Sequence, residues 1–500
     1  MSGDTKNSSA NNDDESSSDK FSGWTCDQIT PDLCDLIVTE GRIPIREDGL
    51  YVHYWKYSSA DNVNSVDNDN EQVPSPPPLY PVVVLHGGPG MPHNYMLPLK
   101  QLACRPDRYG RTRDIYFYDQ GGCGESVHPV SNRSTQNASN SQDHANTLVD
   151  EHPYLLDPMY YATVELPKVL DHLLGSNSNS GGYHLVANSW GTILAQYFVL
   201  DYYNPKREAA HQQGGIDAGT DPSLFPELAS MTLSGPLSDG DLYVRSQWAD
   251  AEDGGYNNLG QLPPFVRNRI HGLEKGNAYG SAEYQAIDES LTGRFTCRIV
   301  PAPDCFAVSA SGPGLNEDVY VGIQGPSEFT LGGVLEGFNL TGRLPAIEVP
   351  VLLTSGAFDT MRPPVVDALY QALPLAEWTM SEFSGHVTMI DDAGWTNGVV
   401  DDFLGRVEGA TTPLGSNGNG SSSSFRPIPE RCGPAGCVPK ETAVRNARGI
   451  VGDATIDGTG IGDNPVIVSF LSLIAGLVIG RYLLPTNFSS RRVAEGYESI

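Results

Sequence analysis

Three side chains far apart in the sequence, Ser189, Asp359 and His386, have the types and the order that nucleophilic catalysis by a serine requires. A serine hydroxyl is a weak nucleophile, so it needs a general base, an acid that orients the base, and donors for the oxyanion. One recurrent arrangement of these groups follows the chain order serine, acid, histidine. The sequence therefore predicts Ser189 as nucleophile, Asp359 as orienting acid and His386 as general base.

The serine belongs to the stretch "YHLVANSWGTILAQYF", in which an apolar run precedes Ser189 and a helical pattern follows it. This pattern is typical of the sharp strand-to-helix turn that presents a nucleophile, written G-x-S-x-G. Ala187 replaces the first glycine and Gly191 keeps the second, so we expect one extra methyl group to be tolerated. Taken alone, a serine in this place is more often an ordinary turn residue.

The acid and the base also follow predicted strands. Asp359 comes just after the run Val351–Thr354, and His386 lies in "FSGHVTM", the one histidine C-terminal to the predicted cap. Parallel sheets place their sites at the carboxyl ends of the strands, so both side chains are expected at one edge. Singly, Asp359 is equally a helix cap and His386 a surface histidine. Asp391 and Asp392 are alternative acids, but they follow the histidine.

Oxyanion donors are expected from two turns. One is the backbone N–H of Trp190, which follows the nucleophile. The other is Gly87 or Gly88 in "HGGPG", which comes directly after the β-branched run Val82–Leu85. The alternative for this motif is a tight turn without a catalytic role, but its place after a buried strand and upstream of the serine turn favours a donor.

Strands alternate with helices along most of the chain, which predicts an α/β-hydrolase fold: a mostly parallel sheet with helices on both faces and an inserted, largely helical cap. The segment "DLIVTEGRIPIREDGLYVHYWKY" predicts an antiparallel hairpin before this core. The predicted parts are a disordered acidic tail (1–35), the first part of the core (36–236), the cap (237–345), the second part of the core (346–408), a flexible linker (409–464), a transmembrane helix (465–484) and a short tail (485–500).

Composition narrows the function classes. The chain has 31 basic and 61 acidic residues and a net charge of −30, which argues against nucleic-acid binding. Its eight cysteines show no C-x-x-C spacing, so no metal site is predicted and they are interpreted as ordinary thiols. Pairs close in sequence are the candidates for disulfides: Cys26/Cys34, Cys297/Cys305 and Cys432/Cys437.

The motifs "LHGGPG", "YDQGGCGES", "NSWGT", "GAFD" and "GHVTM" together resemble the proline iminopeptidase family of serine α/β-hydrolases over about residues 36–408. The stretch "VYVGIQGPSEFTLGGVLEGFNL" is similar to the cap-to-core segment of the tricorn-interacting members. In that family, glutamates of the cap bind the free α-amine of the substrate. The resemblance places Glu328 in this role and leaves Glu283 or Glu289 as its second acid.

The resemblance implies a serine aminopeptidase that acts through an acyl-enzyme on peptides or aminoacyl amides with a free N-terminus, proline being one possible residue. No cofactor is implied. A carboxylesterase or lipase-like hydrolase with the same triad is the alternative enzyme. A catalytically idle, membrane-tethered interaction protein is the alternative from another class.

The segment "PVIVSFLSLIAGLVIGRYLLP" contains an uncharged run, Val466–Gly480, that extends to Leu484 if Arg481 lies at the interface. It predicts a single-pass C-terminal membrane anchor. Because the N-terminus lacks the apolar segment of a secretory signal, we expect the catalytic body on the cytosolic side. Arg491 and Arg492 favour the opposite orientation through the bias of basic residues.

Overall fold

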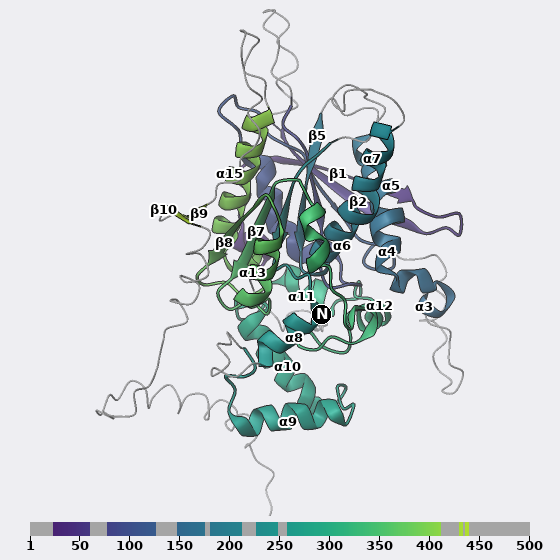
Figure 1. The fold of residues 1–500 in the computed structure, drawn as a ribbon, viewed down its shortest axis with the longest axis vertical. Helices are drawn as coiled ribbons and strands as arrows, with labels where there is room; N and C mark the ends of the chain where they lie inside the picture. Colours follow the sequence, from purple (N-terminus) through teal and green to yellow (C-terminus); the bar gives the residue numbers. More distant parts are fainter. Residues whose placement is uncertain are drawn as a thin grey trace, which may run out of the picture. The chain divides into compact units, whose positions relative to one another are not determined.

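The chain is described by a computed structural model over residues 24–60, 78–126, 148–175, 181–212, 227–248, 258–411, 430–433 and 436–439. Its centre is an eight-stranded sheet with strand order β1-β2-β4-β3-β5-β6-β7-β8 (Figure 1). The strands are β1 Leu36–Pro44, β2 Tyr51–Ser59, β3 Val82–Leu85, β4 Ile115–Tyr118, β5 Gly182–Asn188, β6 Glu227–Ser234, β7 Val351–Gly356 and β8 Ala376–Ser381. The predicted hairpin β1–β2 is antiparallel and pairs antiparallel with β4, while the other neighbours are parallel.

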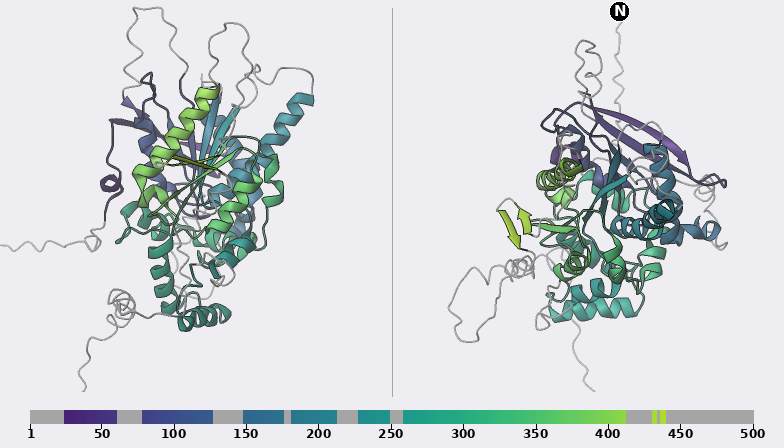
Figure 2. Two further views of the ribbon diagram at one scale, coloured as in Figure 1. Left: turned by 60° about the vertical axis from the view of Figure 1, so that its left-hand side comes forward. Right: turned by 45° about the horizontal axis from the view of Figure 1, so that its top comes forward.

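Alternate residues of the central strands are buried on opposite faces of the sheet. In β3, Val83 and Leu85 pack on the side of α5, α6 and α13, whereas Val82 and Val84 pack on the side of η3 and α15. Because both faces are covered, β3 and β4 consist entirely of buried apolar or aromatic residues. The predicted α/β-hydrolase fold with helices on both faces is confirmed (Figure 2).

The helices of the core precede, connect or follow these strands. They are α1 Cys26–Ile29, η3 His93–Cys104, α3 Leu148–Glu151, η5 Pro153–Leu156, α4 Pro158–Tyr160, η6 Tyr161–Glu165, α5 Leu166–Leu174, α6 Trp190–Phe198, η7 Val199–Tyr203, α7 Asn204–Gln212, α13 Pro363–Ala372, α14 Thr388–Asp391 and α15 Ala393–Thr411. Pro167 lies in the first turn of α5, directly after the π-helical turn η6. Helical backbone runs from η6 into α5 without a break, because Glu165 has φ −73° and ψ −62°, so the proline is accommodated beside a π-helical turn.

A group of helices between β6 and β7 gathers at one end of the sheet, in the segment predicted as the cap (Figure 1). They are α8 Gly240–Trp248, α9 Pro264–Lys275, α10 Ala282–Phe295, α11 Asp304–Ser311, α12 Glu317–Ile323, η9 Gly333–Leu335 and η10 Thr341–Ala346. Helices α9 and α10 share a small apolar cluster that includes Ile270, Leu273 and Leu291. A backbone contact joins this group to the core, because His386 N–H donates to the Phe295 carbonyl oxygen at 2.9 Å.

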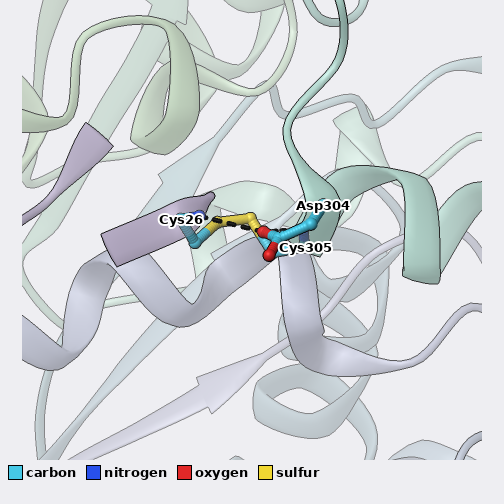
Figure 3. Close-up of side chains that lie close together, drawn as sticks. All are labelled: Cys26, Asp304 and Cys305. Atoms are coloured by element: carbon cyan, nitrogen blue, oxygen red, sulfur yellow. Dashed lines mark hydrogen bonds between the residues drawn. A yellow bond between two sulfur atoms is a disulfide. The ribbon is translucent and has the colours of Figure 1, made fainter. Parts of the chain in front are cut away.

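Two disulfides correct the interpretation of the cysteines as ordinary thiols. Cys26 is bonded to Cys305 at the start of α11 (Figure 3), and Cys34 is bonded to Cys104 at the end of η3. The partners are 279 and 70 residues apart, so the candidate pairs Cys26/Cys34 and Cys297/Cys305 are wrong. The third candidate pair, Cys432/Cys437, stays a prediction; the two residues are opposite each other in β9 and β10. Cys297 is a buried free thiol. The disulfides attach the N-terminal segment to both the core and the cap.

The predicted tail extends too far, because α1 and both disulfide-bonded cysteines of the N-terminal segment fall before residue 36. Similarly, α15 continues to Thr411, beyond the predicted core boundary. A two-stranded hairpin, β9 Glu430–Gly433 and β10 Gly436–Pro439, lies inside the predicted linker. The remaining residues of the tail and linker predictions lie outside the described residues.

The prediction of a single-pass membrane protein is corrected by the helices. A bilayer crossing needs about 20 consecutive apolar residues in a helix. Among the described residues, no helix is both long enough and apolar enough to cross a bilayer. The predicted segment 465–484 itself and the tail 485–500 lie outside the described residues.

Candidate active site

Ser189 occupies a strained turn between β5 and α6. Its backbone has φ 54° and ψ −125°, a conformation that residues other than glycine rarely adopt. The turn is tight, since a Cβ on Gly191 would lie 2.3 Å from the Leu85 carbonyl oxygen. Ala187 is fully buried and its methyl group is accommodated in the sheet. Strain of this kind is a feature of the turn that holds a nucleophilic serine clear of its strand.

Asp359 and His386 meet above the ends of β7 and β8. His386 Nδ1 lies 2.7 Å from Asp359 Oδ1, which also accepts the N–H of Met361 at 2.8 Å. Both residues are buried, at 0% and 3% exposure. A carboxylate bound to Nδ1 fixes the tautomer that leaves Nε2 free to accept a proton.

The remaining ring nitrogen of His386 is free to act as a base. Nε2 has no hydrogen-bond partner among the described residues, and His386 lines the same cavity as Ser189. Gly235, with φ +54°, follows β6 and lies directly under the ring, because a Cβ there would approach His386 Nδ1 to 2.6 Å. The sequence analysis missed Gly235; its position after a buried strand is the signal that was available.

The environment of His386 favours the imidazolium. Burial opposes the charged ring, but the negative charge of Asp359, its hydrogen bond and the charge of Glu328 together raise the pKa of His386. A base that is easily protonated suits proton abstraction from a serine hydroxyl.

The three predicted oxyanion donors differ in availability. Gly88 lines the cavity with φ +50°, and a Cβ there would collide with Met91 Sδ at 2.1 Å, so only glycine fits. The N–H of Gly87 is already engaged, because it donates to Tyr95 Oη at 2.5 Å. Trp190 begins α6, and its backbone N–H lies next to the nucleophile. Gly88 and Trp190 therefore remain the candidates for the oxyanion donors.

Glu328 lines this cavity from the cap side. Tyr320 Oη donates to its carboxylate at 3.3 Å, and Tyr243 Oη donates to its carbonyl oxygen. Burial raises the pKa of the Glu328 carboxyl, and the charge of His386 offsets only part of this effect. Among the described residues Glu328 has no ion-pair partner within 4.0 Å, and a bound ammonium group would supply one.

The second acid predicted beside Glu328 is not where the sequence analysis looked. Glu283 is exposed on α10 and forms an ion pair with Arg269, and Glu289 is also exposed; neither lines the cavity. Asp288 does line it, accepts a hydrogen bond from Ser327 Oγ at 3.0 Å, and has its pKa raised by burial. Asp288 directly precedes Glu289 in α10, so the two side chains differ in the face of the helix that they occupy. The spacing of acidic residues in the sequence does not show which of them faces the cavity.

The alternative acids after the histidine have other partners. Asp391 accepts the backbone N–H groups of Gly385 at 2.8 Å and of Arg298 at 2.7 Å. Asp392 accepts from Ser381 Oγ and from the N–H of Trp395. Both carboxylates therefore hold the loop around His386 rather than its ring.

The cavity has a volume of about 230 Å³, and much of its wall is apolar. The apolar lining residues are Met91, Phe306, Ala310, Leu315, Pro326 and Val387. Among the described residues, the side chains that could gather around a metal are Cys26, Asp304 and Cys305. Both sulfur atoms of this group are joined in the disulfide shown in Figure 3, so it does not offer free thiolates.

Sequence comparison gives two kinds of match. A family model described as the alpha/beta hydrolase fold matches residues 80–235, which include the glycine turn and Ser189. The proline iminopeptidase of Heyndrickxia coagulans is 28% identical over 327 residues, which is 65% of this chain and 91% of that protein. The proline iminopeptidase of Lactobacillus helveticus is 27% identical over 312 residues, 62% of this chain and 85% of that protein.

Structure comparison agrees on the fold. The crystal structure of the proline iminopeptidase of Mycobacterium smegmatis superimposes with a TM-score of 0.52 and 23% identity, covering 75% of this chain and 100% of that one. The crystal structure of VinJ gives a TM-score of 0.52 at 22% identity, covering 74% of this chain and 99% of that one. At such identities the likeness establishes the fold alone.

Proposed function

Because the chain belongs to the proline iminopeptidase family of serine α/β-hydrolases, we propose that it releases the N-terminal residue of peptides or aminoacyl amides, with proline among the residues it accepts. The observation that carries this proposal is a half-buried carboxylate, Glu328, in the same cavity as Ser189 and His386. A carboxylate in this position recognises a free α-amine, which an ester or lipid substrate lacks.

In the proposed reaction, Ser189 Oγ attacks the carbonyl carbon of the N-terminal residue while His386 Nε2 takes its proton. Asp359 keeps the imidazole oriented and stabilises its positive charge. The amides of Gly88 and Trp190 stabilise the oxyanion of the tetrahedral intermediate. His386 then returns the proton to the leaving amine, and water hydrolyses the acyl-enzyme by the same steps in reverse order.

Recognition of the amine is proposed for Glu328 together with Asp288. Burial raises the pKa of both carboxyl groups. An ammonium group between them would restore the charged forms through charge-assisted hydrogen bonds. Removing the ammonium leaves half-buried acids without a counter-ion, so substrates blocked at the amine are disfavoured by about 3–5 kcal/mol.

The apolar wall of the cavity supports a small apolar side chain at the N-terminal position. Phe306, Ala310 and Leu315 come from the cap, while Met91 and Val387 come from the core. These groups lack the charges that a lysine or glutamate side chain would need as partners. A pyrrolidine ring suits such a wall, since it is apolar and compact.

A panel of arylamides tests this function on the full chain. We expect hydrolysis of L-prolyl arylamide and a drop of at least about 100-fold in kcat/KM for its N-acetylated form. Equal rates on the free and blocked forms would remove the aminopeptidase proposal. Hydrolysis of neutral esters with no turnover of any aminoacyl arylamide would instead support the alternative, a carboxylesterase.

A further inference from the structure

The hydroxyl group of Tyr95 lies between the two turns that carry the oxyanion donors. It accepts the N–H of Gly87 at 2.5 Å and donates to Asn188 Oδ1 at 2.9 Å. The two turns are in close contact here, because a Cβ on Gly87 would lie 2.6 Å from Ser189 Cβ. The Tyr95 side chain is therefore a direct link between the glycine turn and the serine turn.

Asn188, the residue before the proposed nucleophile, connects Tyr95 to the end of β6 and to the loop that carries His386. Its Nδ2 donates to the Ser234 carbonyl oxygen at 3.1 Å and to the His386 carbonyl oxygen at 3.4 Å. The side chain is 1% exposed, and hydrogen bonds without competing water hold geometry well. Through Asn188, Tyr95 is connected to the loop that carries the general base.

The peptide unit between Gly87 and Gly88 is held through its carbonyl group. His86 Nε2 accepts the N–H of Gln120 at 2.9 Å, so Nδ1 carries the proton and donates to the Gly87 carbonyl oxygen at 3.0 Å. Burial lowers the pKa of His86 to about 4, which keeps this tautomer neutral. In a trans peptide the C=O and the following N–H point in opposite directions. Anchoring the Gly87 carbonyl therefore aims the Gly88 N–H away from His86.

Tyr95 itself is fixed from the cap. Its backbone N–H donates to Ser309 Oγ of α11 at 3.1 Å. The Ser309 hydroxyl in turn donates to the Pro92 carbonyl oxygen at 3.1 Å. Burial raises the pKa of the Tyr95 phenol, so its proton remains available to Asn188. The cap thus contributes to the position of a hydroxyl that contacts the core turns.

We propose that Tyr95 and Asn188 are positioning residues that hold the Gly87–Gly88 turn against the Ser189 turn, so that the amides of Gly88 and Trp190 converge on one oxyanion. This inference rests on the proposed roles of Gly88 and Trp190. Neither side chain is required to exchange a proton with the substrate. Their effect is on the alignment of two donors, which determines transition-state stabilisation more than substrate affinity.

The first experiment compares Tyr95→Phe with Tyr183→Phe. Tyr183 is a matched control, because it is equally buried and its hydroxyl has no hydrogen-bond partner among the described residues. We expect Tyr95→Phe to lower kcat about 10- to 100-fold with KM changed by less than about 2-fold, while Tyr183→Phe keeps wild-type kinetics. Equal kcat in the two variants, or a loss confined to KM, overturns the proposal.

Labelling by a fluorophosphonate separates this inference from the proposed substrate class. Phosphonylation of Ser189 also develops negative charge on an oxygen, so its rate should fall in Tyr95→Phe by a similar factor even if no aminoacyl arylamide is turned over. An unchanged labelling rate contradicts the positioning role. Failure of arylamide turnover in the wild type, together with slowed labelling in the variant, rejects the aminopeptidase function alone.

A double-mutant cycle with Asn188→Ser tests whether the two residues act as one unit. If they do, the double variant loses about as much kcat as the more damaging single variant. Independent, multiplicative losses contradict the link. Should Tyr95→Phe not fold, Asn188→Ser alone must still lower the labelling rate for the proposal to stand.

Discussion

In the core, Ser189, Asp359 and His386 lie in the turn or loop that follows a strand. In the cap, Asp288 lies within α10 and Glu328 in the loop after α12. The backbone fixes the core residues. Ser189 lies in a strained turn, and His386 packs against Gly235, where any Cβ would collide with the His386 ring. The cap acids are instead fixed by single side-chain hydrogen bonds and by burial. Under the proposed function, this difference assigns the reaction to the core and recognition of the substrate amine to the cap.

Ser189→Ala probes the core side of this comparison and should have the largest effect. Without the hydroxyl there is no acyl-enzyme, so we expect kcat on prolyl arylamide to fall at least about 10⁴-fold. Steady-state kinetics with an active-site titration measures this loss. An unchanged thermal midpoint serves as the control for folding, and activity within about 10-fold of wild type would show that another group is the nucleophile.

Glu328→Gln probes the cap side. We expect kcat/KM for free-amine arylamides to fall about 100-fold, because a charge-assisted bond to the ammonium is lost, while cleavage of a neutral ester changes less than about 3-fold. Asp288→Asn should have the same pattern with a smaller loss. Glu283→Gln, an exposed acid on the same helix as Asp288, is the control and should leave both activities unchanged. Equal losses of kcat/KM on ester and arylamide substrates would contradict the separate roles of core and cap.

Each disulfide can be removed alone, so the attachment of the N-terminal segment to the core and its attachment to the cap can be tested separately. Cys26–Cys305 attaches the N-terminal segment to the cap and Cys34–Cys104 attaches it to the core. Replacing either pair by serine should lower the free energy of unfolding by about 2–4 kcal/mol. The cap bond closes the longer loop, 279 against 70 residues, so its loss should cost about 1 kcal/mol more. Denaturant titration of both double variants measures the difference; identical midpoints would contradict it.

The smallest expected effect is a shift in the pKa of His386 in the core when the charge of Glu328 in the cap is removed. The charge of Glu328 is one of the causes that raise the pKa of His386, although Asp359 contributes more. Since the base is active when neutral, removing this charge in Glu328→Gln should lower the pKa of His386 and move the acidic limb of the kcat/KM profile to lower pH. A neutral ester is the substrate for this measurement, with the wild type as reference. A shift of the limb to higher pH would contradict the coupling.

The sequence was a good guide wherever local backbone rules apply. The glycine turn, the serine turn and the strand ends were placed correctly because tight turns and buried parallel strands impose strong limits on residue type. It was a poor guide to Asp288, because adjacent acidic residues on a helix differ only in the direction they face. It also missed Tyr95, since a tyrosine within an apolar run gives no signal that its hydroxyl lies between two turns.

The sequence by itself determined the fold class, the chain order of nucleophile, acid and base, and the positions that require glycine, because these follow from short-range sterics and the alternation of strands with helices. Only the tertiary structure decided which carboxylates face the cavity, that Tyr95 occupies the N–H of Gly87, and which cysteines pair across 279 residues. These features depend on contacts between segments distant in the chain. Such contacts are set by packing of the whole molecule and leave no periodic trace in the local sequence.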